Sequence, residues 1–181
     1  MALLYGGNYY GRFRAIIPYV NGKSVTEICF GDTVIADHCR KHGLEWRGVD
    51  LNEHFVQRAI RKGFKAELGN VGEMEELPKA DTCIISGSLY HFHDQLEGLL
   101  RKMFASAPLI IISEPVSNLS DKSGIIGKLA KASATVDGKE QHFRYTDKSL
   151  KNALEELSSK MQFSIEIKER FSKDRVILLR K

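Results

Sequence analysis

The chain has 181 residues, of which 43% are hydrophobic and 28% are charged. This composition predicts a globular protein with one sizeable core and excludes disordered, collagen-like and repeat architectures. The formal net charge is +4, and basic and acidic residues are interleaved along the chain, so no basic stripe indicates a nucleic acid partner. The longest apolar runs, such as residues 109–112, are too short to cross a bilayer, which argues against a membrane protein.

The cysteines predict a reducing environment. Cys29, Cys39 and Cys83 are odd in number and form no C-x-x-C pair, which indicates free thiols in a cytoplasmic protein. The N-terminal sequence MALLYGGNYYGRFR lacks the long apolar segment of a secretory signal, in agreement with that location. No linker or internal repeat divides the chain, so we expect one domain over residues 1–181.

Strand-like and helix-like patterns alternate along most of the chain. The pattern predicts strands over residues 23–30, 44–51, 64–68, 81–86 and 108–113. It predicts helices over residues 33–42, 52–62, 94–104 and 146–160. The helix over 52–62 places Phe55, Val56, Ala59 and Ile60 on one apolar face.

The last third of the chain departs from this alternation. Residues 116–145 are rich in lysine, serine and glycine, and we expect a loop with a short amphipathic helix around 125–129. Two strands, over 163–171 and 175–179, close the chain around a turn with the sequence SKD. The order of elements therefore predicts a three-layer α/β fold. Its seven-stranded sheet is mostly parallel and ends in a C-terminal antiparallel hairpin.

Polar residues follow each predicted strand at the edge where ligands bind in such sheets. Asp50 is the most informative, because it stands at the tip of the second strand, one strand–helix–strand unit after Glu27. A carboxylate at that position accepts hydrogen bonds from both hydroxyls of a ribose. The alternative is that Asp50 caps the helix over 52–62.

The stretch EICFGDT, residues 27–33, resembles the first motif of the class I S-adenosylmethionine-dependent methyltransferases, E/D-x-G-x-G-x-G. Glu27 matches the acid and Gly31 the middle glycine, while Cys29 and Thr33 stand where the family has its outer glycines, so the motif is degenerate. Similar features follow in order over residues 22–181: GVDLN at 48–52, LGNV at 68–71, ADTCIISGSLYHF at 80–92, and the closing hairpin.

The resemblance implies a Rossmann-like methyltransferase fold, with S-adenosylmethionine as cofactor and S-adenosylhomocysteine as product. It implies an enzyme that transfers a methyl group, and the short N-terminal segment favours a small-molecule acceptor over nucleic acid. The segment 1–22 is expected to cover the cofactor, with Tyr10 as a clamp, although packing of an N-terminal helix is an equal alternative. The insertion over 116–145 resembles a substrate lid, in which Arg144 would engage an anionic substrate. The alternative, which the sequence slightly favours, is a surface loop with ordinary charges.

The resemblance also implies roles for single residues in cofactor binding. Glu27 would lie near the cofactor's ammonium group, and Gly31 would pass under its methionine moiety. The other cofactor-binding positions are Cys29 in the same loop, Asp50 at the ribose, Leu51 on the adenine, Asn70 at the adenine amino edge, and Ser86 and Gly87 beside the sulfonium.

Three residues are candidates for catalysis. Tyr90 and His91 follow the fourth strand, and a neutral histidine there would take a proton from the attacking group. Glu114 ends the fifth strand and would orient substrate or act as base; alternatively it bonds loop amides. The sequence H-x-H-D at 91–94 also invites a metal interpretation, but no other ligand motif supports one, and His91 and His93 would otherwise bond or cap the next helix.

Two rival functions remain open. A noncatalytic module that binds S-adenosylmethionine or S-adenosylhomocysteine would keep Asp50 and the fold without needing His91 or Glu114. A degenerate α/β domain would bind no cofactor at all. A nicotinamide-dependent dehydrogenase is disfavoured, because the G-x-G-x-x-G sequence that a pyrophosphate needs is absent.

Overall fold

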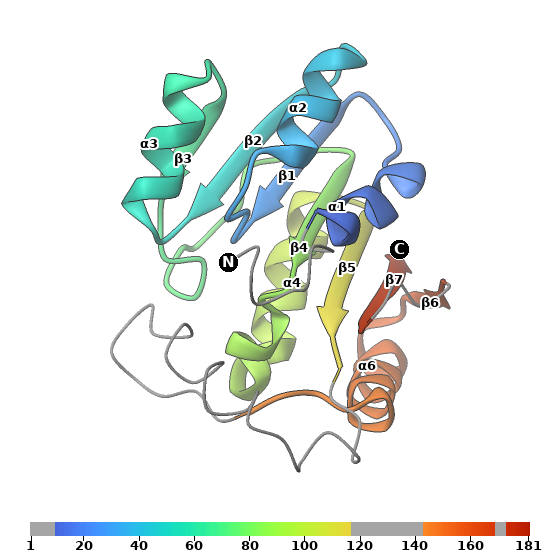
Figure 1. The fold of residues 1–181 in the computed structure, drawn as a ribbon. Helices are drawn as coiled ribbons and strands as arrows, with labels where there is room; N and C mark the ends of the chain where they lie inside the picture. Colours follow the sequence, from blue (N-terminus) through green and yellow to red (C-terminus); the bar gives the residue numbers. More distant parts are fainter. Residues whose placement is uncertain (1–9, 117–142, 169–172) are drawn as a thin grey trace, which may run out of the picture.

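The computed structural model describes residues 10–116, 143–168 and 173–181, which form a seven-stranded sheet covered by helices (Figure 1). The strands are β1 (Ser24–Ile28), β2 (Glu45–Asp50), β3 (Lys65–Leu68), β4 (Thr82–Ser86), β5 (Leu109–Pro115), β6 (Ser164–Ile167) and β7 (Asp174–Arg180). The α-helices are α1 (Gly11–Ile16), α2 (Val34–Lys41), α3 (Glu53–Arg61), α4 (Leu96–Ser106) and α6 (Asp147–Met161). Two 3₁₀ segments accompany them, η2 (Ile17–Tyr19) and η3 (Leu89–Gln95).

The strand order is β3-β2-β1-β4-β5-β7-β6. The first five strands along the chain run parallel, whereas β7 pairs antiparallel with both β5 and β6. The predicted α/β architecture, with its mostly parallel sheet and C-terminal antiparallel hairpin, is therefore confirmed. The order reverses between β1 and β4, which makes their carboxyl ends the topological switch point where open α/β sheets bind ligands.

Each face of the sheet has its own apolar core. Helices α1, α2 and α3 cover one face, and α4 and α6 cover the other (Figure 1). Alternation along β1 sends Val25 to the α1–α2 face and Ile28 to the α4–α6 face, as expected for period-two side chains. Strand β4 is buried along its whole length, as is usual for a parallel strand between two helical layers. No helix in the described segments is long and apolar enough to span a bilayer.

Two sequence-based predictions about single residues are wrong. Ile60 was expected on the buried face of the 52–62 helix, but it is 46% exposed, while Val56 and Ala59 are buried as predicted. Helix α3 packs on β2 and on the edge strand β3, so no further strand covers its outer flank. Asp174 was assigned to the SKD turn, but it is the first residue of β7 and is buried.

Other elements differ from prediction mainly at their ends. Helix α4 begins at Leu96, because η3 precedes it, and β5 extends through Glu114 and Pro115. The expected helix over 125–129 and most of the 116–145 insertion lie outside the described residues. The strand expected over 163–171 is described only as Ser164–Ile167.

Gly48 in β2 has a packing reason to lack a side chain. A β-carbon there would overlap the indole of Trp46 and the ring of Phe30. These two rings meet edge to face, with centroids 5.3 Å apart, directly beneath the loop that follows β1. The glycine therefore makes room for the aromatic pair that supports this loop.

We expect Gly48→Ala to lower the free energy of unfolding by about 1–3 kcal/mol, since it overpacks the Trp46–Phe30 contact. The matched control is Gly98→Ala in α4, where nothing lies within 4 Å of an added β-carbon. That change should instead stabilise the protein by roughly 0.5–1 kcal/mol through helix propensity. Urea unfolding of both variants measures the difference, and equal effects of the two substitutions would contradict the packing role of Gly48.

Candidate active site

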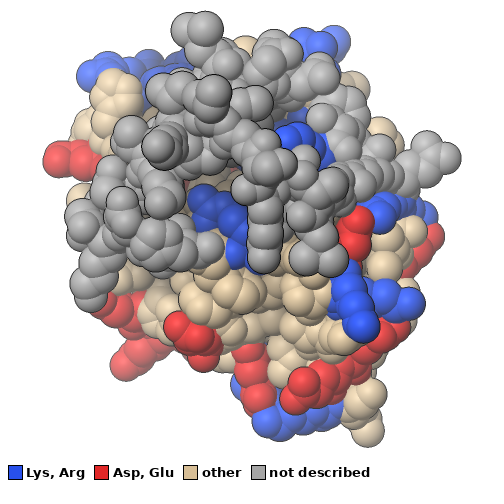
Figure 2. All heavy atoms as spheres, turned by 60° about the horizontal axis from the view of Figure 1, so that its bottom comes forward, with Lys and Arg blue, Asp and Glu red and all other residues tan. Residues whose placement is uncertain are grey.

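The carboxyl ends of the parallel strands lie together at one edge of the sheet, toward which the arrowheads of β1, β2 and β5 point at the bottom of Figure 1. Figure 2 brings this edge forward and shows basic side chains near the centre of the view, uncharged described surface below them, and acidic and basic side chains toward the margin. Most residues predicted for the site come from the β1–α2, β2–α3 and β4–η3 connections, whereas Glu27 lies in β1, Asn70 follows β3 and Glu114 lies in β5.

The loop from β1 to α2 turns sharply through two residues with left-handed backbone. Gly31 has φ +56°, and Cys29, a non-glycine residue, has φ +52°. The Cys29 amide donates to the carbonyl of Val49 in β2 at 2.7 Å, which fixes the start of the turn. Cys29 thus adopts the conformation usually left to glycine, which costs of order 1–2 kcal/mol. Burial also raises the pKa of its thiol, and the nearby Asp50 adds to this shift, which favours the protonated thiol over the nucleophilic thiolate.

Asp50, at the end of β2, ties the two neighbouring loops together. Its Oδ2 accepts from the amide of Gly31 at 3.0 Å, and its Oδ1 accepts from the amide of Asn52 at 2.8 Å. The side chain is 7% exposed, and burial raises its pKa, although the hydrogen bonds from Asn52, Gly31 and Leu51 offset part of that shift. The N-cap of α3 is Asn52, which accepts from the amide of His54, so the capping role considered for Asp50 belongs to its neighbour.

Glu27 is fully buried on the α1–α2 face of the sheet. Its Oε2 accepts from Nε1 of Trp46 at 2.9 Å, while Oε1 has no hydrogen-bond partner in the described part of the chain. Burial raises the pKa of Glu27 well above its ordinary value; the Trp46 bond opposes this shift, and the nearby charges of Asp32 and Asp50 add to it. A carboxyl group in this state favours a cationic ligand, because an adjacent positive charge stabilises the ionised form.

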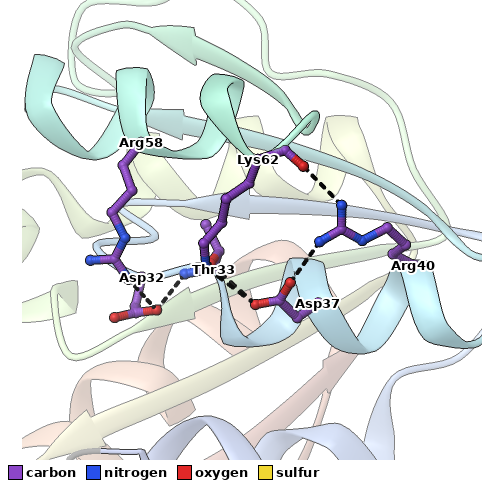
Figure 3. A network of polar contacts seen from close by, with 6 residues as sticks. All are labelled: Asp32, Thr33, Asp37, Arg40, Arg58 and Lys62. Carbon is purple, nitrogen blue, oxygen red and sulfur yellow. Dashed lines mark hydrogen bonds and ion pairs between the residues drawn. The ribbon is translucent and has the colours of Figure 1, made fainter.

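A polar network joins the loop to α2 and α3 (Figure 3). Asp32 Oδ1 accepts from the amide of Thr33 at 2.7 Å and forms an ion pair with Arg58 at 2.9 Å. Lys62 Nζ donates to Thr33 Oγ1 at 2.5 Å. On α2, Asp37 accepts from Thr33 Oγ1 at 3.3 Å and from Arg40 at 2.8 Å. Thr33, at the third glycine position of the motif, therefore links both helices, which a glycine could not do.

The adenine side of the predicted site contains Leu51 and Asn70. Leu51 is 41% exposed, directly beyond Asp50. Asn70 is partly buried, and its Oδ1 accepts from the amide of Gly72 at 3.0 Å, which closes a turn after β3. Both residues stand at the carboxyl ends of β2 and β3, on the same side of the switch point as Asp50.

Three buried oxygen atoms without hydrogen-bond partners among the described residues cluster on one side of the sheet. They are Oε1 of Glu27, Oγ of Ser86 and Oγ of Ser113. Glu27 is in register with Ile84, two residues before Ser86, and Ser86 is in register with Ser113. All three side chains thus share the α1–α2 face near the carboxyl ends of β1, β4 and β5. Such atoms in a native protein call for a polar partner.

The sequence did not reveal an ion pair beside Gly87. Arg12 of α1 donates to Asp174 of β7 through Nε at 2.9 Å and Nη2 at 3.2 Å, and both side chains are buried. A β-carbon on Gly87, which has φ +67°, would overlap the Arg12 guanidinium. The two charged residues are far apart in sequence, and no local pattern marks either as a partner of the other.

Glu114 is fully buried and faces backbone amides. Its Oε2 accepts from the amide of Leu89 at 3.0 Å and its Oε1 from that of Tyr90 at 3.3 Å, at the start of η3. Burial raises the pKa of Glu114 to about 8, against the lowering effect of these two bonds. The carboxyl group thus makes the amide contacts considered as the alternative to a direct catalytic role.

The other two catalytic candidates, Tyr90 and His91, contact each other. The rings of Tyr90 and His91 lie 4.0 Å apart, and the guanidinium of Arg144 covers the Tyr90 ring at 3.6 Å. His93 stacks on Phe143 at 4.0 Å and approaches the Tyr90 carbonyl with Nδ1 at 3.1 Å. The described residues contain no group of three or more His, Cys, Asp or Glu side chains that could hold a metal ion.

Tyr10 lies at the N-terminus of α1 and is 46% exposed, so its described surroundings do not bury its ring. Residues 1–9, which include the rest of the predicted clamp, lie outside the described residues. A surface pocket lined in part by Asp81, Pro108 and Arg180 lies at the opposite, amino edge of the sheet. Asp81 serves there as a structural acceptor for the amides of Lys23 and Ser24.

Several solved structures that are similar to nearly the whole chain are methyltransferases. An S-adenosylmethionine-dependent methyltransferase from Mesorhizobium loti has a TM-score of 0.69 and 19% identity, and the match covers 98% of this chain and 100% of the other. A methyltransferase of the same description from Archaeoglobus fulgidus has a TM-score of 0.66 and 19% identity, over 94% and 92% of the two chains. This chain has the fold of S-adenosylmethionine-dependent methyltransferases.

A third structure of this fold is magnesium protoporphyrin IX methyltransferase from Synechocystis with bound S-adenosylhomocysteine. Its TM-score is 0.66 at 16% identity, and the match covers 99% of this chain and 84% of the other. At the level of sequence, no protein-family model and no curated protein matches the chain. The methyltransferase fold implied by the sequence motifs is thus confirmed by structural likeness at low identity.

The left-handed backbone at Cys29 predicts an unusual order of stability for two substitutions. We expect Cys29→Gly to be more stable than Cys29→Ala by roughly 0.5–1 kcal/mol, since glycine adopts this φ without strain. Cys39, buried in α2, is the matched control, where alanine should be more stable than glycine by about 1 kcal/mol. Chemical denaturation of the four variants provides the measurement, and a preference for alanine at both positions would refute strain at Cys29.

The raised pKa of Glu114 predicts that stability depends on pH. The native state holds this proton more tightly than the unfolded state, so unfolding free energy falls as pH rises from about 4.5 to about 8. The slope from this group reaches roughly 1.4 kcal/mol per pH unit. Glu114→Gln stays neutral, so its unfolding free energy should fall less steeply between these pH values than that of the wild type.

Urea unfolding at several pH values compares the slopes, with Glu97→Gln as the control. Bonds from Lys160 and Arg101 lower the pKa of Glu97, so its removal should change stability equally across the same pH range. If the unfolding free energy of the Glu114→Gln protein depended on pH as steeply as that of the wild type, Glu114 would not be the group that holds the extra proton in the native state.

Proposed function

We propose that the protein is a methyltransferase that binds S-adenosylmethionine and methylates a small-molecule acceptor. The observation that carries the proposal is the convergence of Glu27, Gly31 and Asp50 at the switch point of a sheet with the methyltransferase fold. Asp50 accepts from the amide of Gly31 at 3.0 Å, so the acid assigned to the ribose and the glycine assigned to the methionine moiety lie side by side.

The residues at this edge fit the nucleoside part of the cofactor. The oxygens of Asp50 accept from the amides of Gly31 and Asn52, and a carboxylate has lone pairs for further donors, which ribose hydroxyls would provide. The exposed Leu51 offers an apolar surface to the adenine. The amide of Asn70 is held by its bond to Gly72, and it would face the adenine amino edge.

The charge of the site fits a cationic cofactor. Glu27, Asp32 and Asp50 surround the β1–α2 loop, and the latter two raise the pKa of Glu27. An ammonium or sulfonium group is attracted by these carboxyls, and it would satisfy the buried Oε1 of Glu27.

The bound cofactor supplies a methyl group already activated on a sulfonium, so the chain mainly orients the reactants and excludes water. Held by Asp50 and the β1–α2 loop, S-adenosylmethionine would give its methyl group to the acceptor and leave as S-adenosylhomocysteine. His91, whose ring lies against Tyr90, would take the proton that the acceptor releases. Glu114 would act indirectly, by holding the amides of Leu89 and Tyr90 in place.

Two observations support a small-molecule acceptor. Basic side chains on the described surface of this edge are interspersed with acidic ones, unlike a nucleic acid interface (Figure 2). One of the similar structures is named for magnesium protoporphyrin IX, itself a small molecule.

The alternative of a noncatalytic binding module is favoured by the engagement of Glu114 with backbone amides. Release of S-adenosylhomocysteine during turnover distinguishes the enzyme from the module.

Calorimetric titration with S-adenosylmethionine and S-adenosylhomocysteine tests the cofactor assignment. We expect Asp50→Asn to weaken binding by about 1–3 kcal/mol, because buried ribose hydroxyls lose a charged acceptor. The wild type should bind S-adenosylhomocysteine more tightly than its 2′-deoxy analogue, and the variant should lose this preference.

The control is Glu53→Gln, the same loss of charge three residues away in the first turn of α3. It should bind within about twofold of wild type, since it removes no hydrogen bond to the ligand. Equal affinity of the Asp50→Asn and wild-type proteins would refute the ribose assignment. No binding of either cofactor form to the wild type at millimolar concentration would end the methyltransferase proposal.

A further inference from the structure

Arg144 has an unusual environment for a partly buried arginine. Its Nη1 donates to the carbonyl of Phe143 at 2.7 Å, and its guanidinium lies over the Tyr90 ring at 3.6 Å. Among the residues that the structure describes, no carboxylate forms an ion pair with it. The other partly or fully buried arginines in the same segments each have such a partner: Arg12 pairs with Asp174, Arg58 with Asp32, and Arg175 with Asp147.

The location of Arg144 connects it to the site. Tyr90, on which the guanidinium stacks, follows Gly87 at the end of β4, and its amide is held by Glu114 at the end of β5. The His91 ring packs against the same tyrosine. Arg144 therefore stands beside the β4 and β5 ends, whereas Asp50 and Leu51 stand at the β2 end across the switch point.

The surroundings of Arg144 hold it in place without neutralising it. Phe143 stacks on His93 at 4.0 Å and meets the buried Tyr145 edge to face at 4.9 Å, so both neighbours of Arg144 in the chain are anchored. Stacking on Tyr90 orients the plane of the guanidinium, and within the described segments only its Nη1 has a hydrogen-bond acceptor, the carbonyl of Phe143. A guanidinium fixed in this way is suited to bind a carboxylate or phosphate through paired hydrogen bonds.

We propose that the acceptor carries an anionic group, a carboxylate or a phosphate, which Arg144 binds beside the Tyr90 and His91 rings. This inference rests on the proposed methyltransferase function, because only that function makes the site a binding site for a methyl acceptor. Arg144 is then a specificity-determining residue: it anchors the charged end of a small molecule whose nucleophilic atom faces the methyl group. The flanking rings favour acceptors with a planar body.

Direct binding of three probes tests the proposal without requiring the true acceptor. The probes are 4-hydroxybenzoate, phenyl phosphate and the uncharged 4-hydroxybenzamide, titrated calorimetrically into the full chain with and without saturating S-adenosylhomocysteine. We expect at least one of the two anions to bind the wild type about tenfold more tightly than the amide, and the better anion identifies carboxylate or phosphate as the group bound.

Arg144→Gln should lower the affinity for the better-binding anion about tenfold or more. Its affinity for 4-hydroxybenzamide should stay within about twofold of the wild-type value. Arg180→Gln is the matched control, since Arg180 also lacks a carboxylate partner in the described segments but lies at the amino edge of the sheet. It should bind both classes of probe as the wild type does.

The proposal is overturned if neither anion binds the wild type at millimolar concentration. It is equally overturned if the two anions bind no better than the amide, or if Arg144→Gln leaves the affinity of the better anion unchanged. Failure of the proposed function has a different signature, because S-adenosylhomocysteine itself would then not bind the wild type. The anion titration in the absence of that cofactor still reports on Arg144 in this case.

Discussion

The arrangement of the site depends on the buried carboxylate of Asp50. A carboxylate shielded from water needs hydrogen bonds, and here the amides of Gly31 and Asn52 supply them from two different loops. The same hydrogen bonds fix the turn after β1 and the entry to α3. One side chain therefore sets the positions of these two loops relative to each other. Glu27, in the neighbouring strand, is a second buried acid. Its burial adds to the free-energy cost of folding the protein when no cation compensates the carboxyl groups of the site.

The β1–α2 loop is held by side chains where the family pattern relies on glycine. Cys29 takes a left-handed backbone at an energetic cost, and Thr33 uses its hydroxyl to join Lys62 and Asp37 (Figure 3). Asp32 adds an ion pair to Arg58 on α3. These contacts restrain the loop from both helices. A motif that lacks two of its three glycines therefore corresponds here to a stiffer loop and not simply to a defective one. The loss of two glycines therefore does not by itself argue against binding.

Most of the fold follows from local patterns, whereas parts of the site depend on contacts between distant segments. Strand and helix periodicity identified the sheet and its closing hairpin, and the acids at the ends of β1 and β2 stood out because strand ends are local features. The Arg12–Asp174 ion pair could not be predicted, because its members come from α1 and β7, which are far apart in the sequence. Asp174 was placed in a loop because only the turn-forming residues around it were considered. Ile60 was misplaced because its exposure depends on α3 lying at the sheet edge, which periodicity within the helix does not encode.

The charges of the proposed site differ between its two halves. Acids gather on the β1–β2 side around Glu27, Asp32 and Asp50, and the guanidinium of Arg144 stands on the β4–β5 side over Tyr90. A cationic cofactor is attracted to the acids of one half, and an anionic acceptor is attracted to the guanidinium of the other. Such a separation orients both reactants before any contact with the reacting atoms. In a reaction whose leaving group is already activated, this orientation is the main contribution that the chain has to make.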